Sequence, residues 1–94
     1  MSQIRIIGLH IADRIKEAGN TQSVLARHSR IIRSRLGFHE LNEDICSRNG
    51  IIILNLAGTV AEQDALVNDL KAIGGLEVRE MSFDLDKVSV SNCG

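Results

Sequence analysis

The chain repeats its own order of apolar and polar residues at a constant offset of 45 residues, without gaps. In each half the matches fall where a strand, a turn, a helix start, a helix and a second strand would follow one another. This agreement across levels indicates a duplicated structural unit rather than chance matches among aliphatic residues. The matched pairs are Leu9 with Leu54, Ile11 with Leu56, Ala12 with Ala57, Ile15 with Val60, Glu17 with Glu62, Leu25 with Leu70, Ile31 with Leu76, Leu36 with Met81 and Phe38 with Phe83.

The second copy of the unit begins with a strand and a well-marked helix start. The apolar run Ile51–Leu56 is long enough for a buried strand and too short to span a membrane. Gly58 ends the run, and Thr59 is followed three residues later by Glu62. This spacing is a capping box, in which each side chain satisfies a free amide of the first helical turn. We therefore predict a helix that starts here.

The same helix should end at the pair Gly74 and Gly75, because glycine readily takes the left-handed conformation that stops a helix. Leu76–Phe83 then resumes with the short alternation of a strand. One face of the helix gathers aliphatic side chains at helical spacing. These are Leu66, Val67, Leu70 and Ile73.

The first copy of the unit carries weaker signals. We predict a strand over residues 3–12, an N-cap at Asp13, a helix to about His28 and a second strand over Arg30–Phe38. Gly19 and Asn20 disfavour helix, so this helix should be the weaker one, kinked or starting late near Asn20. Its buried side should hold Ala18, Thr21, Val24, Leu25 and His28.

Two such units in tandem predict an α+β fold of the ferredoxin-like βαββαβ kind, with a four-stranded antiparallel sheet and both helices on one face. Residues 1–94 should form a single domain, with a core over about 3–83, a polar connection over 39–49 and a polar tail over 84–94. The first and third strands should be central. Their helix-facing residues should be Ile7, Leu9, Ile11, Ile52, Leu54 and Leu56.

The opposite face of this sheet is too apolar for water. Alternation places Ile4, Ile6, Ile51 and Ile53 there, together with Gly8, His10 and Asn55. A sheet covered on one side usually shows polar residues on the other. We therefore predict that this face is covered by a second copy of the chain, in a homodimer or a higher homo-oligomer.

Composition excludes several functions. There is no Trp or Tyr to stack on bases, and no segment resembles a DNA-reading helix, so direct nucleic-acid binding is not expected. Residues 1–50 hold eight Lys or Arg against five Asp or Glu, and residues 51–94 hold three against seven. Opposite charge on the two halves suits contacts between subunits. Without a signal or membrane segment, we expect a cytoplasmic protein, in which Cys46 and Cys93 are free thiols; the alternative is a disulfide between them.

Three segments resemble a known family. They are RLGF at Arg35–Phe38, GIIILNLAGT at Gly50–Thr59 and GGLEV at Gly74–Val78. Together they are similar to the iron-only hydrogenase system regulators, and the resemblance extends over about residues 3–82. It implies an ACT-like fold, also similar to the C-terminal ligand-binding domain of nickel-responsive repressors, and a regulatory role linked to hydrogenase genes. The longer, more acidic central connection and the tail depart from the family, and we expect those segments to serve partners of this protein's own.

The resemblance implies no catalytic residue, and the sequence itself shows no nucleophile elbow, Walker loop or dinucleotide fingerprint. We therefore expect a regulatory or ligand-sensing domain rather than an enzyme, and the sequence identifies no cofactor. ACT-type domains bind small effectors near strand-to-helix turns at subunit interfaces. The matching residues here are His10, Asp13, Gly58 and Thr59, with Asn55 on the open face. The alternative to an effector site is that these turns serve only to start the helices.

Two further sites stay open from the sequence. Arg33 and Arg35 share a parity on the second strand and could bind a phosphate or carboxylate, or pair with Glu77, Glu80 or Asp84 of another subunit. Alternatively, His10, His39 and Cys46 could bind nickel or another transition metal across a subunit interface. Their spacing matches no local ligand pattern.

Overall fold

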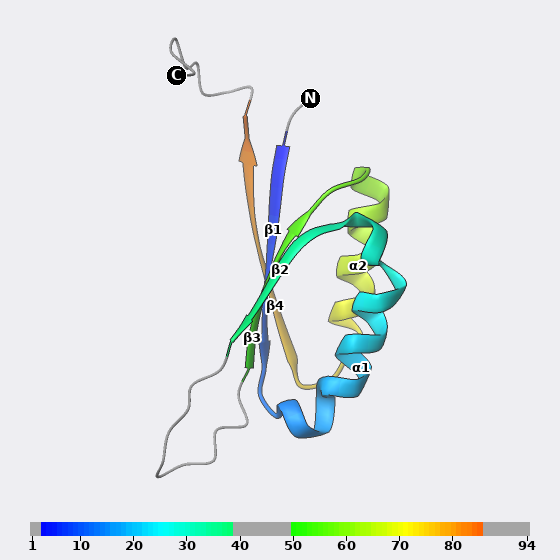
Figure 1. Ribbon diagram of the computed structural model, residues 1–94, viewed down its shortest axis with the longest axis vertical. Coiled ribbons are helices and arrows are strands. Elements are labelled where there is room, and N and C mark those ends of the chain that lie inside the picture. The colour runs from blue at the N-terminus through cyan, green and yellow to red at the C-terminus, as the bar shows by residue number, and fades with distance from the viewer. Residues whose placement is uncertain (1–2, 39–49, 86–94) are drawn as a thin grey trace.

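The computed structural model describes residues 3–38 and 50–85, and it has the predicted ferredoxin-like architecture (Figure 1). The helices α1 and α2 lie together on one side of the sheet, and none of the described residues covers the other side. In chain order the elements are β1 (Gln3–Ile11), α1 (Arg14–Arg27), the 3-10 turn η1 (Ser29–Ile31), β2 (Ile32–Phe38), β3 (Gly50–Leu56), α2 (Val60–Lys71) and β4 (Leu76–Asp84).

The sheet has the strand order β2-β3-β1-β4, and every neighbouring pair is antiparallel. The central strands are therefore β1 and β3, as predicted, and each comes from a different copy of the repeat. His10 lies opposite Ile51 of β3 on one side and opposite Glu77 of β4 on the other. This register fixes which side chains share a face of the sheet.

The core lies between the sheet and the helices, and its buried hydrophobic side chains among the described residues are all Ile, Leu or Val. The predicted helix-facing parity is confirmed, since all six residues are buried and Ile7 and Leu54 have no exposed surface. From the helices, Thr21, Val24 and Leu25 of α1 are buried as predicted. The buried residues of α2 are Gln63, Leu66, Val67 and Leu70, with Ile73 partly buried against them.

The predicted capping box of α2 is confirmed. The amide of Glu62 donates to the hydroxyl of Thr59 at 3.1 Å, and the amide of Thr59 donates to the Glu62 carboxylate at 2.9 Å. These bonds satisfy two amides that the first turn of a helix leaves without partners. In α1 the predicted late start is wrong, because the helix runs unbroken from Arg14 through Gly19 and Asn20. Packing of Val24 and Leu25 outweighs the small propensity cost of the two residues.

The predicted second strand also needs correction. It starts at Ile32 rather than Arg30, because Ser29–Ile31 forms the 3-10 turn. A bulge then lies between Ile32 and Ser34, so that Arg33 is an extra residue without a partner in the register. A bulge changes which face the following residues occupy.

Among the described residues, no helix has the length and apolar character needed to cross a membrane.

Candidate functional site

The face of the sheet that the helices do not cover is called the open face. The register places its side chains in rows that cross the strands. One row holds Ile51, His10 and Glu77; the next Leu36, Ile53, Gly8 and Arg79; the third Ser34, Asn55, Ile6 and Met81; and the last Ile4 and Phe83.

Most of the open face is apolar. The predicted residues Ile4, Ile6, Ile51 and Ile53 lie there and are only partly buried. Three further large apolar side chains join them, and they are more exposed: Leu36 at 63%, Met81 at 54% and Phe83 at 48%. Since Met81 and Phe83 share their parity on β4 with Glu77, the alternation of that strand could have identified them. Contiguous exposed apolar surface of this kind marks an interaction site. Its use as a subunit interface stays a prediction.

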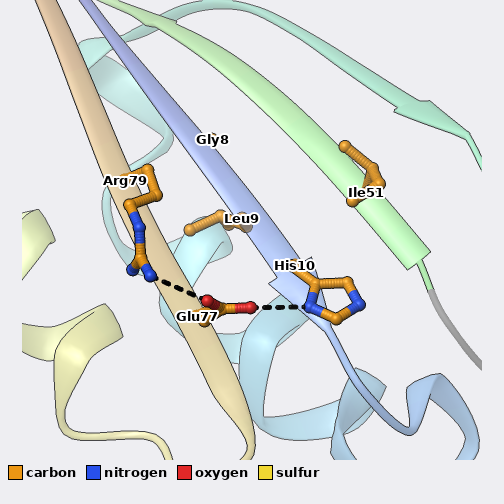
Figure 2. A pocket seen from close by; sticks show the side chains of 6 residues that line it. All are labelled: Gly8, Leu9, His10, Ile51, Glu77 and Arg79. Atoms are coloured by element: carbon orange, nitrogen blue, oxygen red, sulfur yellow. Dashed lines mark hydrogen bonds and ion pairs between the residues drawn. The ribbon is translucent and has the colours of Figure 1, made fainter.

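A polar cluster of three side chains lies at one end of the open face (Figure 2). His10 of β1 donates from Nδ1 to Oε1 of Glu77 at 2.9 Å. Arg79 of β4 donates from Nη2 to Oε2 of the same carboxylate at 2.8 Å. Both oxygens of Glu77 are thus engaged, one by a residue of the neighbouring strand β1 and one by a residue of β4 itself. The hydrogen bond from His10, followed by the positive charge of Arg79, lowers the pKa of Glu77.

Two shallow hollows meet at this cluster. The first has a volume of about 210 Å³ and is lined by Gly8, Leu9, His10, Ile51, Glu77 and Arg79. It exists because Gly8 carries no side chain between Ile53 and Arg79 in its row. The second, of about 290 Å³, lies at the strand ends and is lined by His10, Ala12, Gly75, Leu76 and Glu77. The arrangement offers imidazole, guanidinium and carboxylate groups beside apolar walls, which suits binding of a small molecule.

The predicted ligand residues do not form one site. His10 and Asp13 lie where β1 leads into α1, whereas Gly58 and Thr59 lie where β3 leads into α2. Because β1 and β3 are antiparallel neighbours, these two turns are at opposite ends of the sheet. Asn55 is on the open face two rows from His10.

The turn at Gly58 is filled by the chain itself. Gly58 has a positive φ of 77°, and a Cβ added there would lie 2.7 Å from Cγ2 of Ile31. Gln63, which is buried in α2, donates from Nε2 to the carbonyl of Ala57 at 3.0 Å. The structure therefore supports the helix-start interpretation of Gly58 and Thr59.

The basic edge predicted from Arg33 and Arg35 is altered by the bulge. Arg35 lies opposite Leu54, whose side chain faces the helices, and it donates to Oε1 of Gln22 on α1 at 2.9 Å. The next residue, Leu36, returns to the open face opposite Ile53. The assumption of a shared parity for the two arginines does not survive an inserted residue.

The acidic residues of β4 have partners within the same chain. Glu77 pairs with His10 and Arg79, and Glu80 pairs with Arg5 at 2.8 Å. Arg5 also reaches Asp64 of α2 at 2.8 Å, so it ties a helix to two strands. Sequence reasoning missed this contact, because Arg5 interrupts an apolar strand and showed no sign of a partner.

The described residues add no ligand to the alternative metal site. Within residues 3–38 and 50–85, no group of three or more His, Cys, Asp or Glu could hold a metal ion. His39 and Cys46 lie outside the described residues, as does Cys93. The site built from His10, His39 and Cys46 therefore stays a prediction.

Comparisons with known proteins are informative for the fold. No family model and no curated protein matches the sequence. The solved structure of the uncharacterized protein TM1266 from Thermotoga maritima is similar, with a TM-score of 0.74 and 24% identity over 88% of this chain and 100% of that chain.

Two further solved structures are similar at lower identity. CPII, a nitrogen regulatory PII-like protein from Thiomonas intermedia K12 bound to ADP, AMP and bicarbonate, has a TM-score of 0.53 and 12% identity, over 90% of this chain and 94% of that chain. A formyltetrahydrofolate deformylase from Pseudomonas putida KT2440 has a TM-score of 0.53 and 10% identity, over 83% of this chain but 28% of that chain. At these identities the likeness shows a shared fold alone.

Proposed function

We propose that this chain is a non-enzymatic regulatory domain that senses a small molecule and works as a homo-oligomer joined through its open face. The observation that carries the proposal is the group of partly buried isoleucines on the open face of the central strands, extended by Leu36, Met81 and Phe83. A second copy is the simplest cover for such a surface, because one self-complementary patch then serves both subunits.

The polar cluster at the end of the open face is the proposed effector site. Without a ligand, the two oxygens of Glu77 accept hydrogen bonds from His10 and Arg79. A ligand with an anionic group can take over the donors of Arg79 and His10, since guanidinium binds carboxylate or phosphate in bidentate fashion. The hollow of about 290 Å³ beside His10 gives room for the rest of a small molecule.

Several observations support regulation rather than catalysis. The fold also occurs in CPII, a regulatory protein whose structure contains small molecules. The segments at Arg35–Phe38, Gly50–Thr59 and Gly74–Val78 support a link to iron-only hydrogenase regulation through their resemblance to that regulator family. The polar cluster lacks the ordered nucleophile, base and orienting group of known hydrolytic sites. We place the protein in the cytoplasm, where unpaired thiols persist.

The oligomer is tested by replacing one isoleucine of the open face with lysine. Light scattering after size exclusion should give a dimer or larger for the unmodified protein and a monomer for Ile53→Lys, with unchanged circular dichroism. Val60→Lys is the matched control, because Val60 is equally apolar and 59% exposed but lies at the start of α2. A monomeric unmodified protein would refute the proposal.

The effector site is tested by thermal unfolding in the presence of small carboxylates and phosphates. A ligand at a hundred times its Kd stabilises the folded state by about 2.7 kcal/mol, which raises the Tm measurably. Glu77→Gln and His10→Ala should change that shift, whereas Glu80→Gln should not. For the hydrogenase link, disruption of the gene in its host should alter hydrogenase activity. Unchanged activity would remove that part of the proposal.

A further inference from the structure

We infer that the two copies pair about a two-fold axis that runs along β3, so that Leu36 of each copy enters the hollow at Gly8 of the other. The same axis brings Asn55 of one copy against Asn55 of the other. This inference rests on the proposed oligomer and adds its geometry. It is carried by a protruding side chain, a hollow and an unsatisfied amide on the same face.

The protrusion and the hollow lie at matching positions. Leu36, Ile53 and Gly8 occupy one row, on β2, β3 and β1. A half-turn about an axis along the middle strand exchanges the two outer strands, so Leu36 lies over Gly8 of the other copy and Ile53 over its own counterpart. Leu36 is the most exposed large apolar side chain of the described residues, at 63%. Facing sheets pack about 10 Å apart with interdigitating side chains, so a leucine opposite a glycine fills the gap.

Asn55 supplies an independent reason for the same axis. It is the polar residue of β3 on the open face, and its Oδ1 is buried without a hydrogen-bond partner. Its row neighbours are Ser34 and Ile6. A buried carbonyl without a partner costs about 1–3 kcal/mol. Because an amide carries both a donor and an acceptor, two asparagines related by a two-fold axis can satisfy each other after rotation about χ2.

The charged residues of β4 exclude the main competing arrangement. An axis between β3 and β1 would cover all four strands, and it would place Leu36 over Arg79 and Ile6 over Asn55 of the other copy. The guanidinium, its partner Glu77 and the amide would then be buried against aliphatic side chains, which is costly. The axis along β3 leaves β4 at the border of the overlap, so Leu36 contacts only the inner side of the Glu77–Arg79 pair, whose outer side stays in water together with Met81 and Phe83.

The first test is a rescue experiment on the protrusion and the hollow. Gly8→Val and Leu36→Ala should each weaken the dimer by about tenfold or more in sedimentation equilibrium. The double variant should recover most of the affinity, because the new valine meets the shortened residue 36 of the other copy. Gly8→Val should fold, since a Cβ at Gly8 makes only ordinary contacts, at 3.8 Å to Cδ1 of Ile53. Simple additivity of the two losses would overturn the axis.

The second test mixes two charged variants at the amide. Asn55→Asp and Asn55→Lys should each dimerise at least about tenfold more weakly than the unmodified protein, because like charges would meet. An equimolar mixture should form a one-to-one heterodimer, detected by native mass spectrometry. As the competing axis pairs Asn55 with Ile6, mixing would then give no gain. A dimer that Ile53→Lys disrupts but that shows neither rescue would overturn this axis and leave the proposed function standing; an unmodified protein that stays monomeric would overturn both.

Discussion

The two faces of the sheet are built from alternate residues of the same strands, yet they have different surroundings. On β3, Leu54 has no exposed surface under the helices, while its neighbour Ile53 on the open face is only partly buried. Both are aliphatic, so hydrophobicity alone does not tell the faces apart. What distinguishes them is that the amphipathic helices supply a cover for one parity only. The other parity is equally in need of a cover, and the chain does not supply it from its described residues.

The largest expected difference between the faces is in stability. Leu54→Ala should lower the free energy of unfolding by about 2–5 kcal/mol, because a cavity remains in a closely packed core. Ile53→Ala should cost about 1 kcal/mol or less in dilute solution, since its site is open to water. Urea unfolding at low protein concentration measures both. Equal losses would show that the open face is already covered within one chain.

A glycine in the turn before α2 and a glycine on the open face give the next comparison. Gly58→Ala should destabilise by about 1–3 kcal/mol, because alanine disfavours a φ of 77° and its Cβ would collide with Ile31. Gly8→Ala should change the stability of the single chain little, as the added Cβ meets nothing closer than 3.8 Å. Thermal denaturation of both variants provides the measurement. A large loss for Gly8→Ala would mean that the hollow is tighter than described.

A smaller effect is expected from the helix cap beneath the covered face. Thr59→Ala removes the hydroxyl that accepts from the amide of Glu62, and it should cost about 1 kcal/mol. Ser34→Ala on the open face also removes a hydroxyl, but one that caps no helix. The free energy of unfolding should therefore change by no more than about 0.5 kcal/mol. Chemical denaturation distinguishes the two. Thr59→Ser should restore most of the loss if the hydroxyl is responsible.

The smallest effect is a dependence of stability on acid. The pKa of Glu62 is lowered by the backbone amide of Thr59 and then by its hydroxyl, and that of Glu77 by His10 and then by Arg79. A carboxylate with a lowered folded pKa stabilises above its ordinary value, 4.5, and loses that contribution as pH falls through the folded pKa. The urea concentration at the midpoint of unfolding should therefore decrease as the pH is lowered below about 4.5.

Glu62→Gln and Glu77→Gln should each reduce that slope. The effect of Glu77→Gln should also depend on His10, so it should largely vanish when His10→Ala is present. An unchanged acid slope in both glutamine variants would contradict the assignment of these two hydrogen bonds.

The sequence was sufficient for the fold and for the assignment of residues to the two faces. The offset repeat predicted both central strands, and alternation along β1 and β3 predicted which residues are buried, such as Ile7 and Leu54. The spacing of Thr59 and Glu62 predicted the helix start. These signals are local or periodic, and each follows from backbone geometry that any chain must obey.

The missed features depend on contacts between distant residues or on irregular backbone. No sequence pattern marks the bulge at Arg33, and it turned Arg35 toward Gln22. Arg5 is anchored by Asp64 and Glu80, which are 59 and 75 residues away in the chain. The cluster of His10, Glu77 and Arg79 requires the register between β1 and β4, which the sequence does not fix. Clusters of side chains from different strands can therefore be identified only from the structure, whereas the fold can be predicted from local and periodic patterns.

The strand order also governs what happens when the polypeptide is cut. Neither half of the repeat contains two strands that are hydrogen-bonded to each other, because β1 pairs with β3 and β4, and β2 pairs with β3. A peptide of residues 1–38 or of residues 50–94 would thus lack every ladder of the sheet. When the two peptides are mixed, we expect their strands to pair with each other in the native order. The mixture should then regain the native circular dichroism spectrum, which neither peptide shows alone.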